Sequence, residues 1–569
     1  MKLVFREYLA SLRERRELDV VLPDLLSELG YTIISRPSVG TRQYGVDIAA
    51  LGPKTEQERK VYLFSLKQGD LNRADWDGTA QALRSSIDEI LDVYIPNRIS
   101  TQHEEKKIVI CLCFGGEILE ALRDNITGFI RRHTTERVSF QEWNGDHIAG
   151  LLSEGILREP LVGKSVRSSF QKAIAMVDEP EISFLHFSAL IQGLLASPAQ
   201  TPQERAGILR QIYICLWVMF VWARDADNLE SSYKASELAI LQAWQLIRGD
   251  IDGKGNLAIR LTFAELTDLH FNIGDTFFEK KITPFVEAKH ALSVAVLSAN
   301  AADVNLKLFE ILGRISLRGL WVLWGLGGDD VVPKPCFPPA PDEARRIANT
   351  IIHLIDNNPC LLSPIADEQS IDIGIALLFL AMMEEYRGAA GDYTDHLISR
   401  ITFAFISHGQ YPTIHREYRT LIEHPREATE EYRKTETKAS TLLPLLSIWA
   451  SALERLRASE SLADFSRKYL KHCNHQFWLI GIDSEERLYK GDLQHGICLT
   501  NIPITTDGVA AMNILDTECK GENQTAFSSL SAIKLGHWPI IIMACRHYRL
   551  PLPPNLWLDL LKSGRKDSQ

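Results

Sequence analysis

Short apolar runs of strand character alternate with helical patterns between residues 31 and 143, and this order is the strongest constraint on the fold. The runs are YTIIS, GVDIAAL and KVYLFSLKQ, then KIVICLCF after a helical stretch and VSFQEW after another helix. Runs of this length that are rich in β-branched and aromatic residues favour strands, and the polar segment GPKTEQER between two of them is typical of a loop. Strands interleaved with helices predict a mixed α/β sheet with helices packed against it.

The character of the chain changes beyond about residue 161. Helical periodicity dominates from there to roughly residue 470, with breaks at 197–202, 248–256 and 327–343. The last break, GGDDVVPKPCFPPAPDE, is rich in proline and glycine and marks the best internal boundary. We therefore expect an α/β domain over residues 1–160, a helical domain over 165–330 and a second helical domain over 343–569.

Composition narrows the class of protein. The 569 residues are 45% hydrophobic and carry a formal net charge of -11, as in an ordinary folded, soluble protein rather than a basic nucleic-acid-binding chain. A local cationic groove remains compatible with this charge. The N-terminus lacks the apolar core of a signal peptide, and the apolar run Ile212–Ala223 is shorter than the ~20 residues of a membrane-spanning helix. These features predict a cytoplasmic protein without a membrane segment and with a buried helix around residue 217.

An acidic residue and a lysine occur at unusual places in neighbouring strand runs. Lys67 closes the half-buried run KVYLFSLKQ, where Ser65 and Lys67 share one face and Gln68 the other. Burying an ammonium group is costly without a partner. Asp47 lies among apolar residues in the preceding run, GVDIAAL. If the two strands pair as a hairpin, the acid and the lysine converge at one edge of the sheet.

The stretches LDVVLPDLLSELGYTI, YGVDI and FSLKQ, in this order, resemble the PD-(D/E)XK restriction-endonuclease superfamily, most closely its Mrr-like branch. That pattern consists of a helix bearing an acid, an apolar LL..LGY segment, a strand with G-x-D and a strand ending in (E/Q)-x-K. The resemblance covers about the first 70 residues well, and the later strand–helix–strand order extends it to about residue 160. It implies a restriction-endonuclease-like α/β domain, followed here by a large, mostly α-helical region.

The resemblance also assigns roles to residues. It implies that Asp47 is the central metal-binding carboxylate and that Lys67 is the catalytic lysine. Asp19 falls where the family carries its helix-borne acid and would be a second metal ligand, although a solvent-facing role for Asp19 is equally compatible with the sequence. Glu28, near the end of the same helix, is a weaker candidate. The family's second strand residue, usually Glu, falls on Ser65.

Ser65 is a departure from the family pattern, because a serine hydroxyl is a poor ligand for a hard cation beside a carboxylate. A bound Mg²⁺ or Mn²⁺ would then depend on the carboxylates of Asp47 and Asp19, on water and on a backbone carbonyl. Asp70 or Glu142 could supply a migrated carboxylate. Divalent metal would polarise the phosphoryl oxygens and lower the pKa of bound water, while Lys67 would orient the attacking water or stabilise the developing charge.

These residues predict a Mg²⁺-dependent endodeoxyribonuclease that binds DNA with the help of Gln68, Arg73 and Lys54. By analogy with similarly built proteins, we expect the effector of a bacterial anti-phage defence or restriction system, regulated by its helical region. That region would mediate homo-oligomerisation or binding of a partner subunit such as an ATPase. The alternative, favoured by Ser65, is a catalytically inactive nuclease-fold scaffold or nucleic-acid-binding subunit.

Overall fold

The computed structural model divides the chain into two compact units, Met1–Ala235 and Ser236–Gln569. It describes Arg6, Leu9 and residues 18–35, 43–53, 58–79, 82–155, 164–196, 199–251, 256–298, 300–326, 342–492, 494 and 496–558. The boundaries expected near residues 160 and 330 fall outside these ranges, so the division into three domains stays a prediction. The expected N-terminal mixed sheet flanked by helices and the mostly helical remainder are both confirmed.

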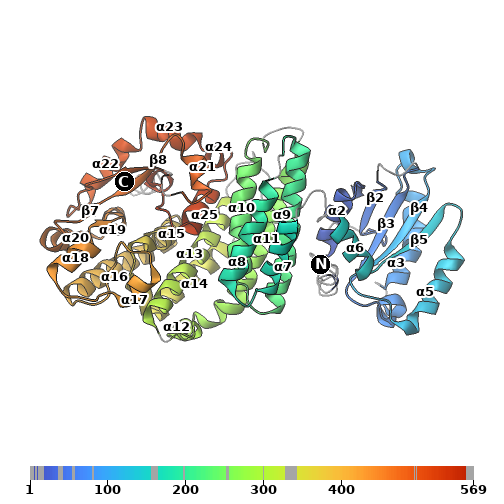
Figure 1. Cartoon of the computed structure of the whole chain (residues 1–569), viewed down its shortest axis with the longest axis horizontal. Coiled ribbons are helices and arrows are strands. Elements are labelled where there is room, and N and C mark those ends of the chain that lie inside the picture. Colours follow the sequence, from blue (N-terminus) through green and yellow to red (C-terminus); the bar gives the residue numbers. More distant parts are fainter. Residues whose placement is uncertain are drawn as a thin grey trace. The chain divides into compact units, whose positions relative to one another are not determined.

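The first unit contains a five-stranded sheet whose strands lie in sequence order, β1 to β5 (Figure 1). The first three strands form an antiparallel meander, and β4 and β5 continue parallel to β3. A parallel pair needs a crossover, which helices supply after β3 and after β4. The strands are β1 (Thr32–Ser35), β2 (Ile48–Leu51), β3 (Val61–Lys67), β4 (Ile108–Phe114) and β5 (Val138–Trp143), each within a predicted run.

Helices cover both faces of this sheet (Figure 1). The crossover helices α3 (Leu83–Glu89) and α5 (Glu120–His133) lie on one face, where their apolar residues form a core with alternate residues of β3 and β4. The other face carries the edge-to-face aromatic contacts of Tyr31, Phe64 and Trp143 and contacts α2 (Asp19–Glu28) and α6 (Gly145–Gly155). As a result every residue of β3 is buried except Lys67, which is partly exposed.

Three further helices in the first unit pack against one another: α7 (Lys164–Ala175), α8 (Pro180–Leu195) and α9 (Pro202–Asp225). A capping box starts α9, because Thr201 accepts from the amide of Glu204 while the Glu204 carboxylate accepts from the amide of Thr201. Among the described helices, α9 is the one long and apolar enough to cross a membrane, and 83% of its most apolar window is buried inside the protein. The expected buried helix around residue 217 is therefore present.

The second unit is built mainly from helices, and α10 (Glu230–Ile247) runs across the division between the units. Its long helices pack pairwise, α13 against α14 and α15, and α16 against α19 and α20. Two short sheets, β6–β7 and β8–β9, lie among them. Its other main elements are α11 (Leu257–Lys281), α13 (Ala301–Leu326), α14 (Glu343–Asn357), α15 (Ser370–Ala381), α16 (Arg387–Ile406), α17 (Tyr418–Glu423), α18 (Glu430–Glu436), β6 (Ala439–Ser440), α19 (Leu442–Ala452), α20 (Leu456–Tyr469), β7 (Asn474–His475), β8 (Phe477–Ile480), β9 (Gly496–Leu499), α22 (Val509–Glu518) and α25 (Pro539–His547).

A buried ion pair joins distant parts of the second unit. Glu237 on α10 is fully buried and pairs with Arg546 on α25, while Nδ1 of His547 lies 3.1 Å from its other carboxylate oxygen. Burial alone would raise the pKa of Glu237, but the charge of Arg546 and the His547 contact outweigh it and lower that pKa to about 2. A charge taken out of water is tolerated only when it is paired in this way.

Candidate functional site

Asp47 directly precedes β2, and Lys67 ends the adjacent antiparallel strand β3, so both lie near the same edge of the sheet. Ile48, the first residue of β2, is opposite Phe64, so continuing the register by one residue places Asp47 opposite Ser65 and two residues from Lys67 on β3. The amide of Asp47 donates to the carbonyl oxygen of Phe64 (2.9 Å), and the Asp47 carboxylate accepts from the amide of Leu66 (2.8 Å). β3 extends past the start of β2, so the amide of Leu66 has no partner on β2. The Asp47 carboxylate accepts its hydrogen bond instead.

The charge of Asp47 affects the pKa of the nearby Cys113 thiol. Cys113 on β4 is the register partner of Leu66, the residue whose amide holds Asp47. Burial, and then the negative charge of Asp47, raise the pKa of the Cys113 thiol well above its usual range. These two effects keep the Cys113 thiol protonated at neutral pH, and the thiolate is the form that acts as a nucleophile.

A docked loop fixes where Asp47 enters the sheet. Gly45 has a φ of +78°, and a Cβ built on it would lie 2.0 Å from the carbonyl oxygen of Ser86 on α3. Tyr44, also at positive φ, lies beneath the guanidinium of Arg98, 5.2 Å from the ring centroid. The glycine of the G-x-D pattern is thus required by a backbone-to-backbone approach that L side chains cannot make. This approach holds Asp47 in register with β3.

Ser65 is buried, with 2% of its surface exposed, on the face of β3 that α3 covers. Its register partner on β4 is Leu112, which belongs to the apolar core of this face. A hydroxyl group fits this position, whereas a carboxylate would need a charged partner or a metal to be stable there. The serine that stands in place of the family's acid is therefore compatible with the apolar packing around it, and its hydroxyl contributes no charge to the site.

Asp19 begins α2, which packs on β1 and β2. A short turn at Gly30 reverses the chain between α2 and β1, so the start of the helix lies toward the end of β1. A ten-residue helix spans about 15 Å, close to the length of a four-residue strand at ~3.4 Å per residue. Because the end of β1 pairs with Ala49 near the start of β2, Asp19 lies toward the same end of the sheet as Asp47.

Of the alternative acids, Glu142 lies away from Asp47. Glu142 is exposed on β5, three strand steps from Asp47, which is about 14 Å at ~4.8 Å per step. The carboxylate of Asp70 accepts from the amide of Glu117 (2.8 Å) in a loop contact. The side chain of Glu28 lies outside the described residues.

The side chains near Asp47 determine which kind of metal site is possible there. Within the described ranges, no three or more His, Cys, Asp or Glu side chains gather as a metal site. Mg²⁺ commonly uses only one or two carboxylates and keeps several waters. Asp47, held by the Leu66 amide, together with Asp19 at the same end of the sheet, fits that minimal requirement but no closed cage.

The predicted nucleic-acid-binding residues are spread around the end of β3. Gln68 is exposed directly after Lys67, and Arg73 is exposed at the start of the segment Ala74–Gly78. That segment carries Asp75 and Asp77, which offset the positive charge of Arg73. Lys54 lies outside the described residues. The described part of this edge therefore presents Lys67 as a partly exposed cation beside mixed charge, not a continuous basic surface.

Backbone hydrogen bonds join the loops that follow β3, β4 and β5. The amide of Gly116 donates to the carbonyl oxygen of Gly69 (2.9 Å), and the amide of Gly145 donates to that of Gly116 (2.9 Å). A Cβ on Gly116 would lie 2.1 Å from Oδ1 of Asp70. The Gly-Gly turn after β4 is therefore a packing requirement, and it ties together the loops beside Lys67.

No protein-family model, curated protein or solved structure matches this chain.

Proposed function

We propose that the N-terminal α/β part is a metal-dependent nuclease of the restriction-endonuclease-like class that cleaves DNA phosphodiester bonds. The observation that carries the proposal is the position of Asp47, directly before β2 and bound to the amide of Leu66, two residues out of register with Lys67 at the end of the adjacent antiparallel strand β3. The strand order supports it, because an antiparallel three-strand meander followed by parallel strands with helical crossovers is compatible with the resemblance in the sequence.

In this proposal each residue has a separate task. Asp47 and Asp19 hold Mg²⁺ or Mn²⁺, which supplies polarisation of the phosphoryl oxygens and an activated water. Lys67 places its ammonium group beside the scissile phosphate and stabilises the negative charge that develops there. Its partial exposure on an otherwise buried strand allows the aliphatic stem to pack while the charge reaches the substrate. The hydrogen bond from Leu66 fixes the Asp47 carboxylate.

We further propose that the helical remainder regulates this activity as part of an anti-phage or restriction system, through self-association or a partner subunit. The size of the second unit, with its own extensive core, leaves room for such a role. Native mass measurement of the full chain, alone and after co-purification with neighbouring gene products, tests this part. A monomer that cuts constitutively would contradict it.

Cleavage of plasmid and single-stranded DNA with Mg²⁺ or Mn²⁺ tests the nuclease proposal. Asp47→Asn keeps an oxygen to accept from the Leu66 amide but removes the charge, and Lys67→Ala removes the cation. Both should abolish cleavage, since removal of a single electrostatic stabiliser costs about 10²–10³ in rate. Lys60→Ala, directly before the opposite end of β3, is the matched control and should cut like the wild type. Cleavage that survives both substitutions would place the chemistry elsewhere.

The second candidate is an inactive nuclease-fold scaffold or nucleic-acid-binding subunit. Burial of Ser65 in place of an acid favours it. A metal titration followed by thermal unfolding separates the two candidates. A working site should be stabilised by Mg²⁺ in the wild type and not in Asp47→Asn. Equal melting temperatures with and without metal in both proteins, together with no cleavage, would support the scaffold.

A further inference from the structure

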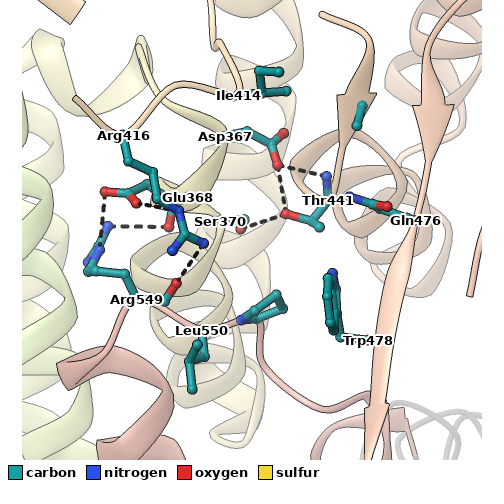
Figure 2. Close-up of a pocket in the computed structure, with 12 residues that line it drawn as sticks. Asp367, Glu368, Ser370, Ile414, Arg416, Thr441, Gln476, Trp478, Arg549 and Leu550 are labelled. Carbon is teal, nitrogen blue, oxygen red and sulfur yellow. Dashed lines mark hydrogen bonds and ion pairs between the residues drawn. The ribbon is translucent and has the colours of Figure 1, made fainter. Parts of the chain in front are cut away.

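A cavity of about 180 Å³ opens in the second unit between α15, α19, β8 and the segment after α25. Figure 2 shows Arg416, Glu368 and Arg549 on one side of it and Trp478 on the other, with Ser370 and further hydroxyl groups between them. An engineered cavity of ~150 Å³ in another protein holds a benzene ring, so this one can admit a single flat ring system.

One side of the cavity carries the guanidinium groups of Arg416 and Arg549 together with the carboxylate of Glu368. The Arg549 guanidinium already has strong partners within the protein. One of its terminal nitrogens lies 2.7 Å from a carboxylate oxygen of Asp372, and the other donates to the carbonyl oxygen of Glu368 (3.2 Å). Arg416 is held more loosely. Its Nε is 3.3 Å from Oε2 of Glu368, its terminal nitrogen is 3.4 Å from the carbonyl oxygen of Arg549, and 47% of its side chain is exposed.

These distances exceed the 2.7–2.9 Å typical of strong charged hydrogen bonds. A guanidinium has five N–H donors, so Arg416 keeps most of them for a ligand. Its half-exposed position puts them at the mouth of the cavity, where a phosphate could remain partly hydrated.

At the back of the cavity, the hydroxyl groups of Ser370 and Thr441 are hydrogen-bonded in series to the carboxylate of Asp367. The carboxylate of Asp367 accepts from the Thr441 hydroxyl (2.7 Å), and it also accepts from the amides of Thr441 (2.7 Å) and Leu442 (3.2 Å) at the start of α19. The Thr441 hydroxyl proton is thereby used, so Ser370, 3.1 Å away, donates to Thr441. The Ser370 oxygen then has only lone pairs left, and it can accept a hydrogen bond from a ligand.

The opposite side offers an aromatic face and an amide. Trp478 on β8 is partly exposed, whereas Trp449 and Trp557 nearby are buried in the core. The side-chain oxygen of Gln476 accepts from the thiol of Cys498 (3.0 Å), which leaves its amide nitrogen as a donor. Leu550 and Pro551 give the cavity an apolar floor.

We propose that this cavity binds a nucleoside phosphate. Its parts match the three parts of such a ligand: Trp478 stacks on the flat base, Ser370 and Gln476 provide an acceptor and a donor for the edge of the base, and Arg416 binds the phosphate. Stacking of one base on an aromatic side chain contributes about 1–3 kcal/mol, and a guanidinium recognises phosphate by charged hydrogen bonds. The same moiety occurs in a free nucleotide and at the 5′-phosphorylated end of a strand, and the experiment separates these sources.

Isothermal titration calorimetry of the full chain provides the test. The probes are the four 5′-mononucleotides, the four nucleosides, inorganic phosphate and a 5′-phosphorylated tetranucleotide. At least one mononucleotide should bind tenfold or more tightly than its nucleoside and than phosphate. Arg416→Gln should weaken that binding about tenfold, which corresponds to ~1.4 kcal/mol. Arg419→Gln is the matched control, because Arg419 is an exposed arginine nearby on α17, outside the cavity.

Trp478→Leu should weaken the same binding, and quenching of tryptophan fluorescence by the nucleotide should shrink in that variant. Thermal unfolding of each variant without ligand identifies one that has lost its fold, and Arg416→Gln, at an exposed side chain, keeps the test decisive in that case. Tighter binding of the tetranucleotide than of any mononucleotide would assign the cavity to strand ends. The proposal fails if no mononucleotide binds up to millimolar concentration, or if Arg416→Gln and Arg419→Gln bind it equally.

Discussion

His537 should make the second unit sensitive to mild acid. It is 3% exposed and packs between Trp244 and Trp324, with ring centroids 5.0 and 5.2 Å away. Within the described part of the chain neither of its ring nitrogens has a hydrogen-bond partner. Burial lowers the pKa of His537 to about 4, below the ordinary histidine value of about 6.5. Between these two pH values the histidine of the unfolded chain is protonated and that of the folded protein is not. The free energy of unfolding therefore decreases as the pH drops from 6.5 toward 4.

The size of the effect follows from the distance in pH. pH 5 is about 1.5 units below the pKa of the histidine in the unfolded chain, whereas the folded histidine is still neutral there. The free energy of unfolding is therefore about 2 kcal/mol lower at pH 5, at 1.36 kcal/mol per unit. His537→Phe removes the titration but keeps an aromatic ring in the Trp244–Trp324 contact. Its loss of stability between pH 7.5 and pH 5 should therefore be about 2 kcal/mol smaller than that of the wild type.

Urea unfolding followed by tryptophan fluorescence at both pH values measures this difference. His396→Gln is the control, because His396 is also a histidine of the second unit but is exposed, on α16. The wild type and His537→Phe losing equal stability on acidification would refute the reasoning, since it would mean that His537 is protonated at no cost in the folded protein.

Three other substitutions test packing in the two units, each by its thermal unfolding midpoint. Gly45→Ala should destabilise the first unit by at least 1–3 kcal/mol, because the alanine would need a left-handed backbone and would overlap a carbonyl oxygen of α3; an unchanged midpoint would contradict the docking of that loop. Gly128→Ala, in the interior of α5 with open space around the new Cβ, should instead stabilise by about 0.5–1 kcal/mol. Arg546→Met should cost about 3–5 kcal/mol by leaving Glu237 buried without its main partner, and a gain in stability would show that the pair is replaceable.

The sheet could be predicted from the sequence because its signals are local. Each strand of the first unit falls within an apolar run bounded by turn residues, and the antiparallel pairing of β2 with β3 follows from a short polar connection. The register that places Asp47 opposite Ser65, two residues from Lys67, depends on that pairing alone. Burial of Ser65 was harder to foresee, because it depends on α3 folding back over the same face of β3.

Long-range partners could not be predicted in the same way. Glu237 finds Arg546 across 309 positions, and no periodicity in either helix points to the other. The cavity likewise collects Asp367, Thr441 and Trp478 from separate segments, and a lone tryptophan on a short strand gave no sign of a partly exposed ring. Such contacts depend on how helices stack in space, which a one-dimensional pattern does not encode.

The burial of β3 on both faces has a consequence for how this protein can diversify. Six consecutive residues of the strand are closed in by its neighbours and by helices, so most replacements there carry the penalty of a disturbed core. Only the last residue, Lys67, and the loop after it reach the surface. Variation that changes the chemistry of this edge, and is still inherited, must therefore accumulate in the loop and at the strand end, while the rest of β3 acts as a fixed frame for it.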